Sequence, residues 1–167
     1  MILKFLSKKF YISFLIVALI YFIDRLSKIY IIQLDENNLG SDIFNSAYLN
    51  IVLIWNKGIA FGLLSFTESY FYNILSLIIS LIVAILVLMT LKSQGFKRYS
   101  LLMIVGGALG NLHDRIMFKA VPDFIDFHVG SFHWFIFNVA DIFITVGVIS
   151  MVILELTNNN KQKNEKF

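Results

Sequence analysis

Four long apolar segments constrain this chain more than any other feature of its sequence. They cover about residues 10–32, 70–91, 99–117 and 134–156. Each is near the roughly 20 residues that a tilted helix needs to cross a hydrocarbon core of about 30 Å. The 167 residues are 58% hydrophobic and only 15% charged, which is more apolar than an average soluble domain. We therefore expect an all-α integral membrane protein with four transmembrane helices.

The length and the two ends of the chain set further limits. Beyond four spans little sequence remains, so we expect one membrane domain over 1–167. Lysines precede the first segment, as in a signal peptide, but no small-x-small cleavage site follows and Asp24-Arg25 comes instead; we interpret it as an uncleaved span. The polar residues 157–167 predict a disordered cytoplasmic tail.

The distribution of basic residues predicts the orientation. Nine of the 14 lysines and arginines lie before the first segment, between the second and third, or after the fourth. By the positive-inside rule both termini are cytoplasmic, and the segments 33–69 and 118–133 face outward. Because these charges flank apolar segments and form no patch with exposed aromatics, the net charge of +3 does not indicate a nucleic-acid partner.

The two outer segments carry the pattern of a small sheet. LNIVLIW (49–55) is followed by the turn-like Asn56-Lys57-Gly58 and by the apolar IAFGLL (59–64), which predicts a strand, a tight turn and a returning strand. In VPDFIDFHV (121–129) the alternation is typical of an extended strand. Pro122 lacks an N–H donor and favours an edge position for that strand.

Three of the four apolar segments carry polar residues at helical spacing on one face. A charged side chain at the bilayer centre costs about 2.5–3.5 kcal/mol on insertion scales, so we expect the three stripes to converge on one site near the outer ends of the helices. The stripes are Asp24, Ser27 and Lys28; Gly107, Gly110, Asn111 and Asp114; and Asn138, Asp141 and Thr145.

A purely structural alternative applies to several of these residues. Gly106 and Gly110 have the small-xxx-small spacing that lets two helices approach closely, and polar side chains at such contacts often serve only as interhelical hydrogen bonds. Asn111, Asn138 and Lys28 fit that role as well as a functional one. Asp141 fits it less well, because an unpaired carboxylate is expensive inside a membrane.

Metal and thiol chemistry find little support in the sequence. The chain has no cysteine, which excludes disulfides and thiolate ligands. Its three histidines, His113, His128 and His133, fit no HExxH-type spacing, and His133 precedes a tryptophan typical of a membrane interface. We therefore expect no metal ligands and no cofactor.

Five stretches, taken in order, resemble the lipoprotein signal peptidase family, also called signal peptidase II. The resemblance covers about residues 24–147 and rests on four blocks of the form N-x-G-x-A-F, G-N-x-x-D-R, apolar-Asp-Phe and F-N-x-A-D, together with a first-helix motif. In this chain they are Asp24 with Lys28, NKGIAFG (56–62), GGALGNLHDR (106–115), VPDFIDF (121–127) and FNVAD (137–141).

This resemblance implies a bacterial inner-membrane aspartic endopeptidase. Such an enzyme removes the signal peptide of a diacylglyceryl-modified prolipoprotein by cutting before the lipidated cysteine. It also implies four helices, a small extracytoplasmic β-cradle and a short outer helix around the active site. The expected partners are prolipoprotein substrates and membrane lipid, and the expected state is a monomer.

The family's motif positions can be placed residue by residue. Its catalytic pair corresponds to Asp123 and Asp141. Its other motif positions correspond to Asn56, Gly58, Asn111, Asp114, Arg115 and Asn138, and its first-helix motif to Asp24 and Lys28. Two departures are visible: Pro122 replaces a usually apolar residue, and Phe135 lies where Trp is commonly followed by Pro.

A carboxyl pair in a low-dielectric site should hold one proton, because both groups cannot easily ionise together. The ionised carboxylate would take a proton from an attacking water, and the protonated carboxyl would hydrogen-bond the carbonyl oxygen. Asp24 with Lys28 and Asp114 with Arg115 could instead be charge pairs that neutralise the helix ends. In that case they would not touch the substrate.

Two other functions remain compatible with the residues alone. Intramembrane aspartates, lysines and asparagines also form relays in small proton- or ion-handling bundles. The glycine-spaced third segment would equally suit an assembly subunit without chemistry. Neither alternative requires an aspartate such as Asp123 outside the helices.

Overall fold

The structure is a computed structural model that describes residues 8–37, 43–58 and 69–164, with side chains left out over 69–71 and 158–164. The chain alternates long helices with short strands. The helices are α1 (Lys8–Asn37), α2 (Ser69–Lys92), α3 (Gly95–Phe118) and α4 (Val139–Asn164), and the strands are β1 (Phe44–Asn45), β2 (Leu49–Asn56), β3 (Val121–Val129) and β4 (Phe132–Phe137).

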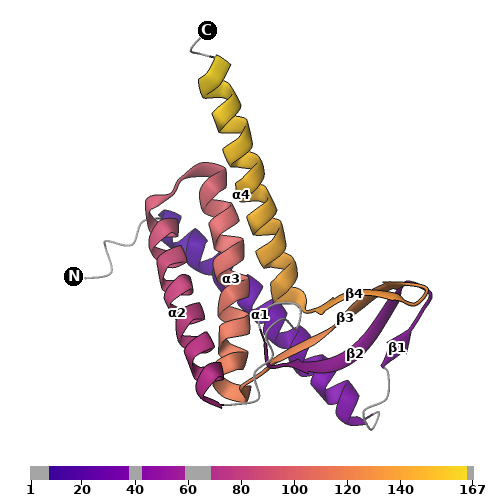
Figure 1. Cartoon of the computed structure of the whole chain (residues 1–167). Coiled ribbons are helices and arrows are strands. Elements are labelled where there is room, and N and C mark those ends of the chain that lie inside the picture. The colour runs from indigo at the N-terminus through magenta and orange to yellow at the C-terminus, as the bar shows by residue number, and fades with distance from the viewer. Residues whose placement is uncertain (1–7, 38–42, 59–68, 165–167) are drawn as a thin grey trace.

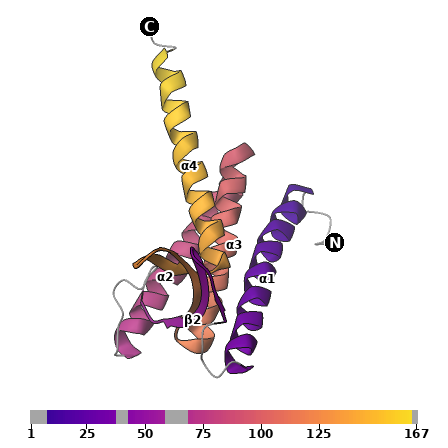
Figure 2. The ribbon, with the colours of Figure 1, turned by 90° about the vertical axis from the view of Figure 1, so that its right-hand side faces the viewer.

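Helix α3 is the centre of the helical part, because α1, α2 and α4 all pack against it. Figure 2 shows α3 between α1 and α2. Glycines on α3 make these contacts close. A Cβ on Gly106 would lie 2.8 Å from the Cβ of Ile20 on α1, and one on Gly107 would lie 2.5 Å from the carbonyl oxygen of Ala140 on α4. The sequence prediction that small residues bring helices together is confirmed.

The helices alternate in direction, so the molecule has two different ends (Figure 1). The beginning of α1, the α2–α3 connection and the far end of α4 lie toward one end. The four strands and the beginning of α4 lie toward the other. The polar stripes of α1 and α3 and the first turn of α4 therefore meet beside the sheet.

The strands form one antiparallel sheet in the order β1-β2-β3-β4, which is curved (Figure 2). The predicted strands at 49–55 and 121–129 are confirmed, but the edge position expected for β3 is wrong, because β3 pairs with β2 and β4. Pro122 is tolerated because β4 pairs with β3 only from Ile125 onward. Its missing N–H therefore need not interrupt that ladder.

Two helices are long and apolar enough to cross a membrane, namely α2 over Tyr72–Lys92 and α4 over Val139–Thr157. Helix α1 has charged residues within its apolar sequence, yet much of its surface is apolar and exposed, with Leu15 67% exposed. Exposed large apolar side chains on long helices are typical of a lipid-facing surface. The molecule is thus a mostly helical membrane protein with a small antiparallel sheet.

Four expectations about the elements need correction or stay open. The fourth apolar segment does not begin a helix at 134, because β4 occupies Phe132–Phe137 and α4 begins at Val139. The predicted disordered tail is wrong as far as Asn164, where α4 ends. The described residues contain no short outer helix, and the predicted returning strand at 59–64 lies outside them.

Candidate active site

The first turn of α4 is closed by a reciprocal pair of hydrogen bonds between Asn138 and Asp141. Asn138 precedes the helix and accepts the backbone N–H of Asp141 on its side-chain Oδ1 at 3.2 Å. Asp141 in turn accepts the backbone N–H of Asn138 on Oδ2 at 3.1 Å. This is the geometry of a capping box, with an amide and a carboxylate in the two roles. It fixes the Asp141 carboxylate at the positive end of the α4 dipole.

Asp123 on β3 reaches the same asparagine. Asn138 donates from Nδ2 to Oδ1 of Asp123 at 2.6 Å, and Asn56 at the end of β2 donates to Oδ2 at 2.8 Å. Asp123 is only 3% exposed. Burial raises the pKa of its carboxyl to about 6, the nearby Asp141 acts in the same direction, and the two amide hydrogen bonds oppose the shift. One residue, Asn138, therefore bridges the two acids, since it binds the Asp123 carboxylate through its side chain and the Asp141 carboxylate through its backbone N–H.

A buried cluster of charges supports this arrangement from α1 and α3. Lys28 is fully buried and donates to Asp24 at 2.9 Å, to Asn111 at 2.8 Å and to Asp114 at 2.7 Å. All three ammonium protons are thus used, as a buried lysine requires. Asn111 connects this cluster to the candidate site, because its Nδ2 donates to Oδ1 of Asp141 at 2.8 Å.

Asp24 also helps to place the beginning of α4. Its Oδ1 accepts the backbone N–H of Ala140 at 3.0 Å, which satisfies one of the donors that a helix leaves free in its first turn. Its other oxygen lies where a Cβ on Gly110 would stand. The absence of a side chain at Gly110 is therefore what lets α1 reach α4 across α3.

The expected charge pairs are half right. Asp24 does pair with Lys28. Asp114, however, pairs with Lys28 at 2.7 Å and with Arg25 at 2.6 Å, not with Arg115 as the sequence suggested. Consecutive residues of a helix point in different directions, so the side chain of Arg115 points away from Asp114. It donates instead to the carbonyl oxygens of Asn111 at 3.3 Å and Gly58 at 3.2 Å.

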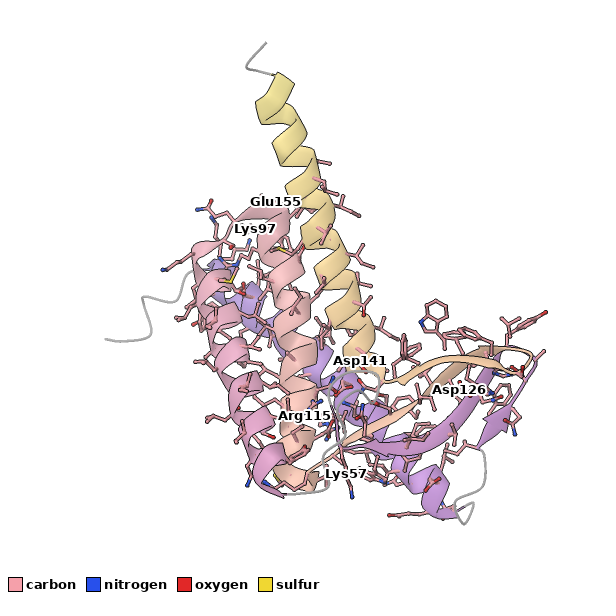
Figure 3. The ribbon with its side chains drawn as sticks, in the orientation of Figure 1. Lys57, Lys97, Arg115, Asp126, Asp141 and Glu155 are labelled. Atoms are coloured by element: carbon pink, nitrogen blue, oxygen red, sulfur yellow. The ribbon has the colours of Figure 1, made fainter. Side chains whose placement is uncertain are left out.

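A cavity of about 430 Å³ opens at these carboxylates. Asp141 and Arg115 lie close together where the helices meet the sheet (Figure 3). The wall beyond them is apolar and comes from α2, α3 and α4, with Val121 at the start of β3. The polar lining consists of Asn56, Asn111, Arg115, Asp123, Asn138, Asp141 and Thr145, and the apolar lining of Ile79, Ala108, Val121, Ile144, Val148 and Ile149. Such a cavity can hold a polar peptide backbone at its polar end and an apolar group against its apolar wall.

Hydrogen bonds and ion pairs connect all the residues that the family resemblance placed at this site. Gly58 also takes part, since its N–H donates to Asn56 Oδ1 at 2.8 Å. Ser27 belongs to the predicted stripe of α1, but among the described residues its hydroxyl donates to its own helix, at the carbonyl of Asp24. Arg25 was missed as the second partner of Asp114. Its position beside a predicted stripe, one residue after Asp24, was the available signal.

Long helices packed around α3, with the buried Asp123 and the partly buried Asp141 at one cavity beside the sheet, are typical of membrane-embedded enzymes that work with acidic side chains. Solved structures agree with this class. A bacterial membrane enzyme determined by the in meso method at 2.3 Å is 30% identical, with a TM-score of 0.72 over 89% of this chain and 90% of that one. Another, determined at 1.9 Å, is 33% identical with a TM-score of 0.67 over 86% and 92%.

Sequence comparison defines the family. The profile of signal peptidase (SPase) II matches residues 16–157. The lipoprotein signal peptidase of Pelagibacter ubique strain HTCC1062 is 49% identical over 95% of this chain and 96% of its own length. That of Anaplasma phagocytophilum strain HZ is 40% identical over 92% and 97%. The chain belongs to the signal peptidase II family, whose members are aspartic-type proteases.

Proposed function

We propose that this protein removes signal peptides from diacylglyceryl-modified prolipoproteins, with Asp123 and Asp141 as the catalytic pair. The observation that carries the proposal is the Asn138 bridge. This asparagine binds Asp123 through its side chain and Asp141 through its backbone N–H, at the wall of a cavity. Two acids held by one residue are placed to act on the same peptide bond.

The chemistry follows from the proton shared by the pair. The ionised carboxylate takes one proton from a water, whose oxygen then bonds to the scissile carbonyl carbon. The protonated carboxyl hydrogen-bonds the carbonyl oxygen as its negative charge develops. Collapse of the tetrahedral intermediate breaks the C–N bond, and the amine of the lipidated cysteine leaves with a proton from the pair. The raised pKa of Asp123, about 6, suits a carboxyl that must carry a proton for part of the cycle.

The neighbouring amides position the two acids. Asn56 and Asn138 each donate to Asp123, and Asn111 donates to Asp141. An amide can hold a carboxylate in one orientation without adding charge. Arg115 stands at the cavity wall and binds the carbonyl of Gly58. We propose that this bond fixes the Gly58 backbone, just after β2, at the edge of the site.

The shape of the cavity suits a substrate that lies in lipid. Its apolar wall takes Ile79 from α2 and Ile144, Val148 and Ile149 from α4, and both helices are apolar enough to cross a membrane. We propose that the signal helix and acyl chains of the substrate reach the carboxylates from the bilayer along this wall. The cysteine backbone then lies at the polar end.

The membrane arrangement is part of the proposal. All four helices cross the bilayer, both termini are cytoplasmic, and the sheet lies at the extracytoplasmic face of the bacterial inner membrane. Helices α2 and α3 have 24 residues each, which is about 36 Å and enough for a hydrocarbon core of about 30 Å. Residues 1–167 act as one domain, and a monomer surrounded by lipid suffices because one chain supplies every group of the site.

Cleavage assays with isosteric variants test the proposal. Wild type, Asp123→Asn and Asp141→Asn are purified in detergent and incubated with a diacylglyceryl-modified prolipoprotein and with its unlipidated form. We expect wild type to cut only the lipidated substrate and both variants to lose at least about 10³-fold in rate, since each removes one half of the acid–base pair. Glu155→Gln, an exposed change at the far end of α4, is the control with wild-type rate.

The assay also separates the rival functions. If both variants fold, judged by thermal unfolding, and still cut at the wild-type rate, the catalytic pair is wrong. If wild type cuts neither substrate but moves protons in liposomes, an ion-handling bundle replaces the peptidase. If the variants change only stability, the two acids are structural.

A further inference from the structure

The outer half of the sheet carries a cluster that the proposed peptidase chemistry does not use. It consists of Asp126 and His128 on β3 and His133 on β4, each with one ligand atom within 4.8 Å of the others. Asp126 lies on the sheet well away from Asp141 (Figure 3). Two imidazoles and one carboxylate are a donor set that divalent transition metals bind.

Strand pairing explains why the three side chains share one face. Asp126 and His128 are two residues apart on β3, and residues at this spacing point to the same side of a strand. The β3–β4 register shifts between these two residues, whereas β3 stays in register with β2 at Asp126 and Phe127. His128 lies directly opposite His133 in the β3–β4 ladder, and cross-strand partners also share a face. The imidazole rings stack with centroids 5.0 Å apart. A sequence search for ligand spacing along one helix could not find this cross-strand set.

Two further contacts give the cluster the character of a ligand site. Nδ1 of His128 is buried and has no hydrogen-bond partner among the described residues, so one imidazole nitrogen is left without the bond that burial normally demands. Asp126 is buried, and Asn50 on β2 helps to orient its carboxylate, since Asn50 Nδ2 donates to Oδ2 at 3.2 Å. A hydrogen bond to a ligating carboxylate is the usual support of a metal site.

We propose that Asp126, His128 and His133 bind a divalent transition metal ion, with Zn²⁺ as the natural fit. Ligands at about 2.1 Å from a tetrahedral ion lie roughly 3.4 Å apart. The three atoms, now within 4.8 Å of one another, must therefore close by at most about 1.4 Å. His133 can make that movement because its side chain is 51% exposed. Its Nδ1 now lies 2.8 Å from Asp126 Oδ2, and a bound metal would replace this hydrogen bond.

The position of the site gives it a structural role. The β3–β4 hairpin begins beside Asp123 and ends at Phe137, directly before Asn138. An ion held by both strands would join them near the tip of the hairpin that connects the two acidic residues. Such a link stabilises the sheet without touching the cavity.

Zinc titration of the untagged, chelator-treated protein in detergent tests the site. We expect isothermal calorimetry to show one Zn²⁺ per wild-type chain, Mg²⁺ to give no binding, and Zn²⁺ to raise the thermal midpoint. Loss of a hydrogen bond to a metal ligand already lowers metal affinity about 10–100-fold. Loss of a ligand itself, in His128→Gln or His133→Gln, should therefore weaken binding at least tenfold and abolish the thermal shift.

The matched control is His113→Gln. His113 lies on α3 and its Nδ1 is 2.9 Å from the Tyr21 hydroxyl, so the substitution removes a histidine outside the cluster and should leave Zn²⁺ binding unchanged. Absence of saturable Zn²⁺ binding by wild type overturns the proposal. Equal binding by wild type and by folded His133→Gln protein overturns it as well. Unchanged peptidase activity of the metal-free protein would leave the proposed function intact.

Discussion

At the scale of single residues, Asn138 is the side chain on which the site depends. It caps α4 through Oδ1, and its Nδ2 donates to Asp123. These two tasks use opposite ends of one amide. Only a residue with both an acceptor and a donor on a short side chain can perform them together.

Two substitutions of Asn138 separate these tasks. Asn138→Ala removes both and should cost about 1 kcal/mol of stability through the lost cap, with a large loss of peptidase rate. Asn138→Ser restores the cap, because serine accepts the N–H of Asp141, but it cannot place an amide donor on Asp123. We expect thermal unfolding to recover in the serine variant and cleavage to stay at least tenfold below wild type. Full recovery of the rate would show that the donor to Asp123 is dispensable.

The raised pKa of Asp123 predicts a pH dependence of stability. Between its ordinary value of 3.8 and about 6, the folded protein binds more protons at this carboxyl than the unfolded chain does. The contribution of Asp123 to the free energy of unfolding is therefore largest below pH 4. It falls as pH rises toward 6, by about 3 kcal/mol in total. Thermal midpoints measured from pH 4 to 7 should fall less steeply in Asp123→Asn than in wild type.

The control for that series is Glu155→Gln, because Glu155 is exposed at the other end of α4. Its curve should parallel that of wild type. Identical slopes for wild type and Asp123→Asn would mean that burial of Asp123 does not perturb its ionisation.

At the scale of elements, the sequence predicted the helices well and their boundaries less well. The length of the apolar segments identified α1, α2 and α3 to within about five residues at each end. It failed at 134–138, because FHWFIF is as apolar as a membrane helix and only its pairing with β3 makes it a strand. The choice between strand and helix there depends on tertiary contacts. The polar residues 157–164 continue α4, although their composition suggested a disordered tail.

In the site, too, the sequence predicted which residues gather but not how they pair. The polar stripes and the family motifs identified which residues would gather, since each helix face is fixed by a period of 3.6 residues. The partners within the gathered set were not predictable. Whether Asp114 binds Arg115 or Arg25 depends on the rotation of α1 against α3, and the link from Asp24 to the Ala140 N–H involves a backbone group that no side-chain pattern reveals.

The contact between α3 and α4 couples packing to the site. A Cβ on Gly107 would lie 2.5 Å from the carbonyl oxygen of Ala140, and a backbone atom cannot rotate out of the way. Gly107→Ala should therefore separate the two helices, lengthen the Asn111–Asp141 hydrogen bond, and cost about 1–3 kcal/mol. We expect lower thermal midpoints together with reduced cleavage.

Met117→Ala is the control for this helix, since Met117 is 63% exposed on α3 and its truncation should change neither property. Wild-type stability and activity in Gly107→Ala would show that α3 and α4 can shift without harm. The proposed coupling between their contact and the site would then be wrong.

At the scale of the whole molecule, charge and apolar surface divide the protein along its long axis. The buried ionic cluster and the sheet occupy one end, while Lys97 and Glu155 lie toward the opposite end of the helices (Figure 3). Between them the exposed surface of the helices is rich in Leu, Ile, Val and Phe. This distribution matches a bilayer with the candidate site near one of its faces.

The proposed topology can be measured because the chain has no cysteine, so wild type is its own unlabelled control. Single cysteines are placed at Lys57 and Val129 near the sheet and at Lys97 and Thr157 toward the other end, all exposed positions. In intact spheroplasts a membrane-impermeant maleimide should label Lys57→Cys and Val129→Cys at once. It should label Lys97→Cys and Thr157→Cys only after permeabilisation, because a bilayer separates the ends. Early labelling of all four positions would show that the helices do not span the bilayer. The reverse pattern would place the carboxylates on the cytoplasmic side. A substrate exported through the membrane could not reach them there.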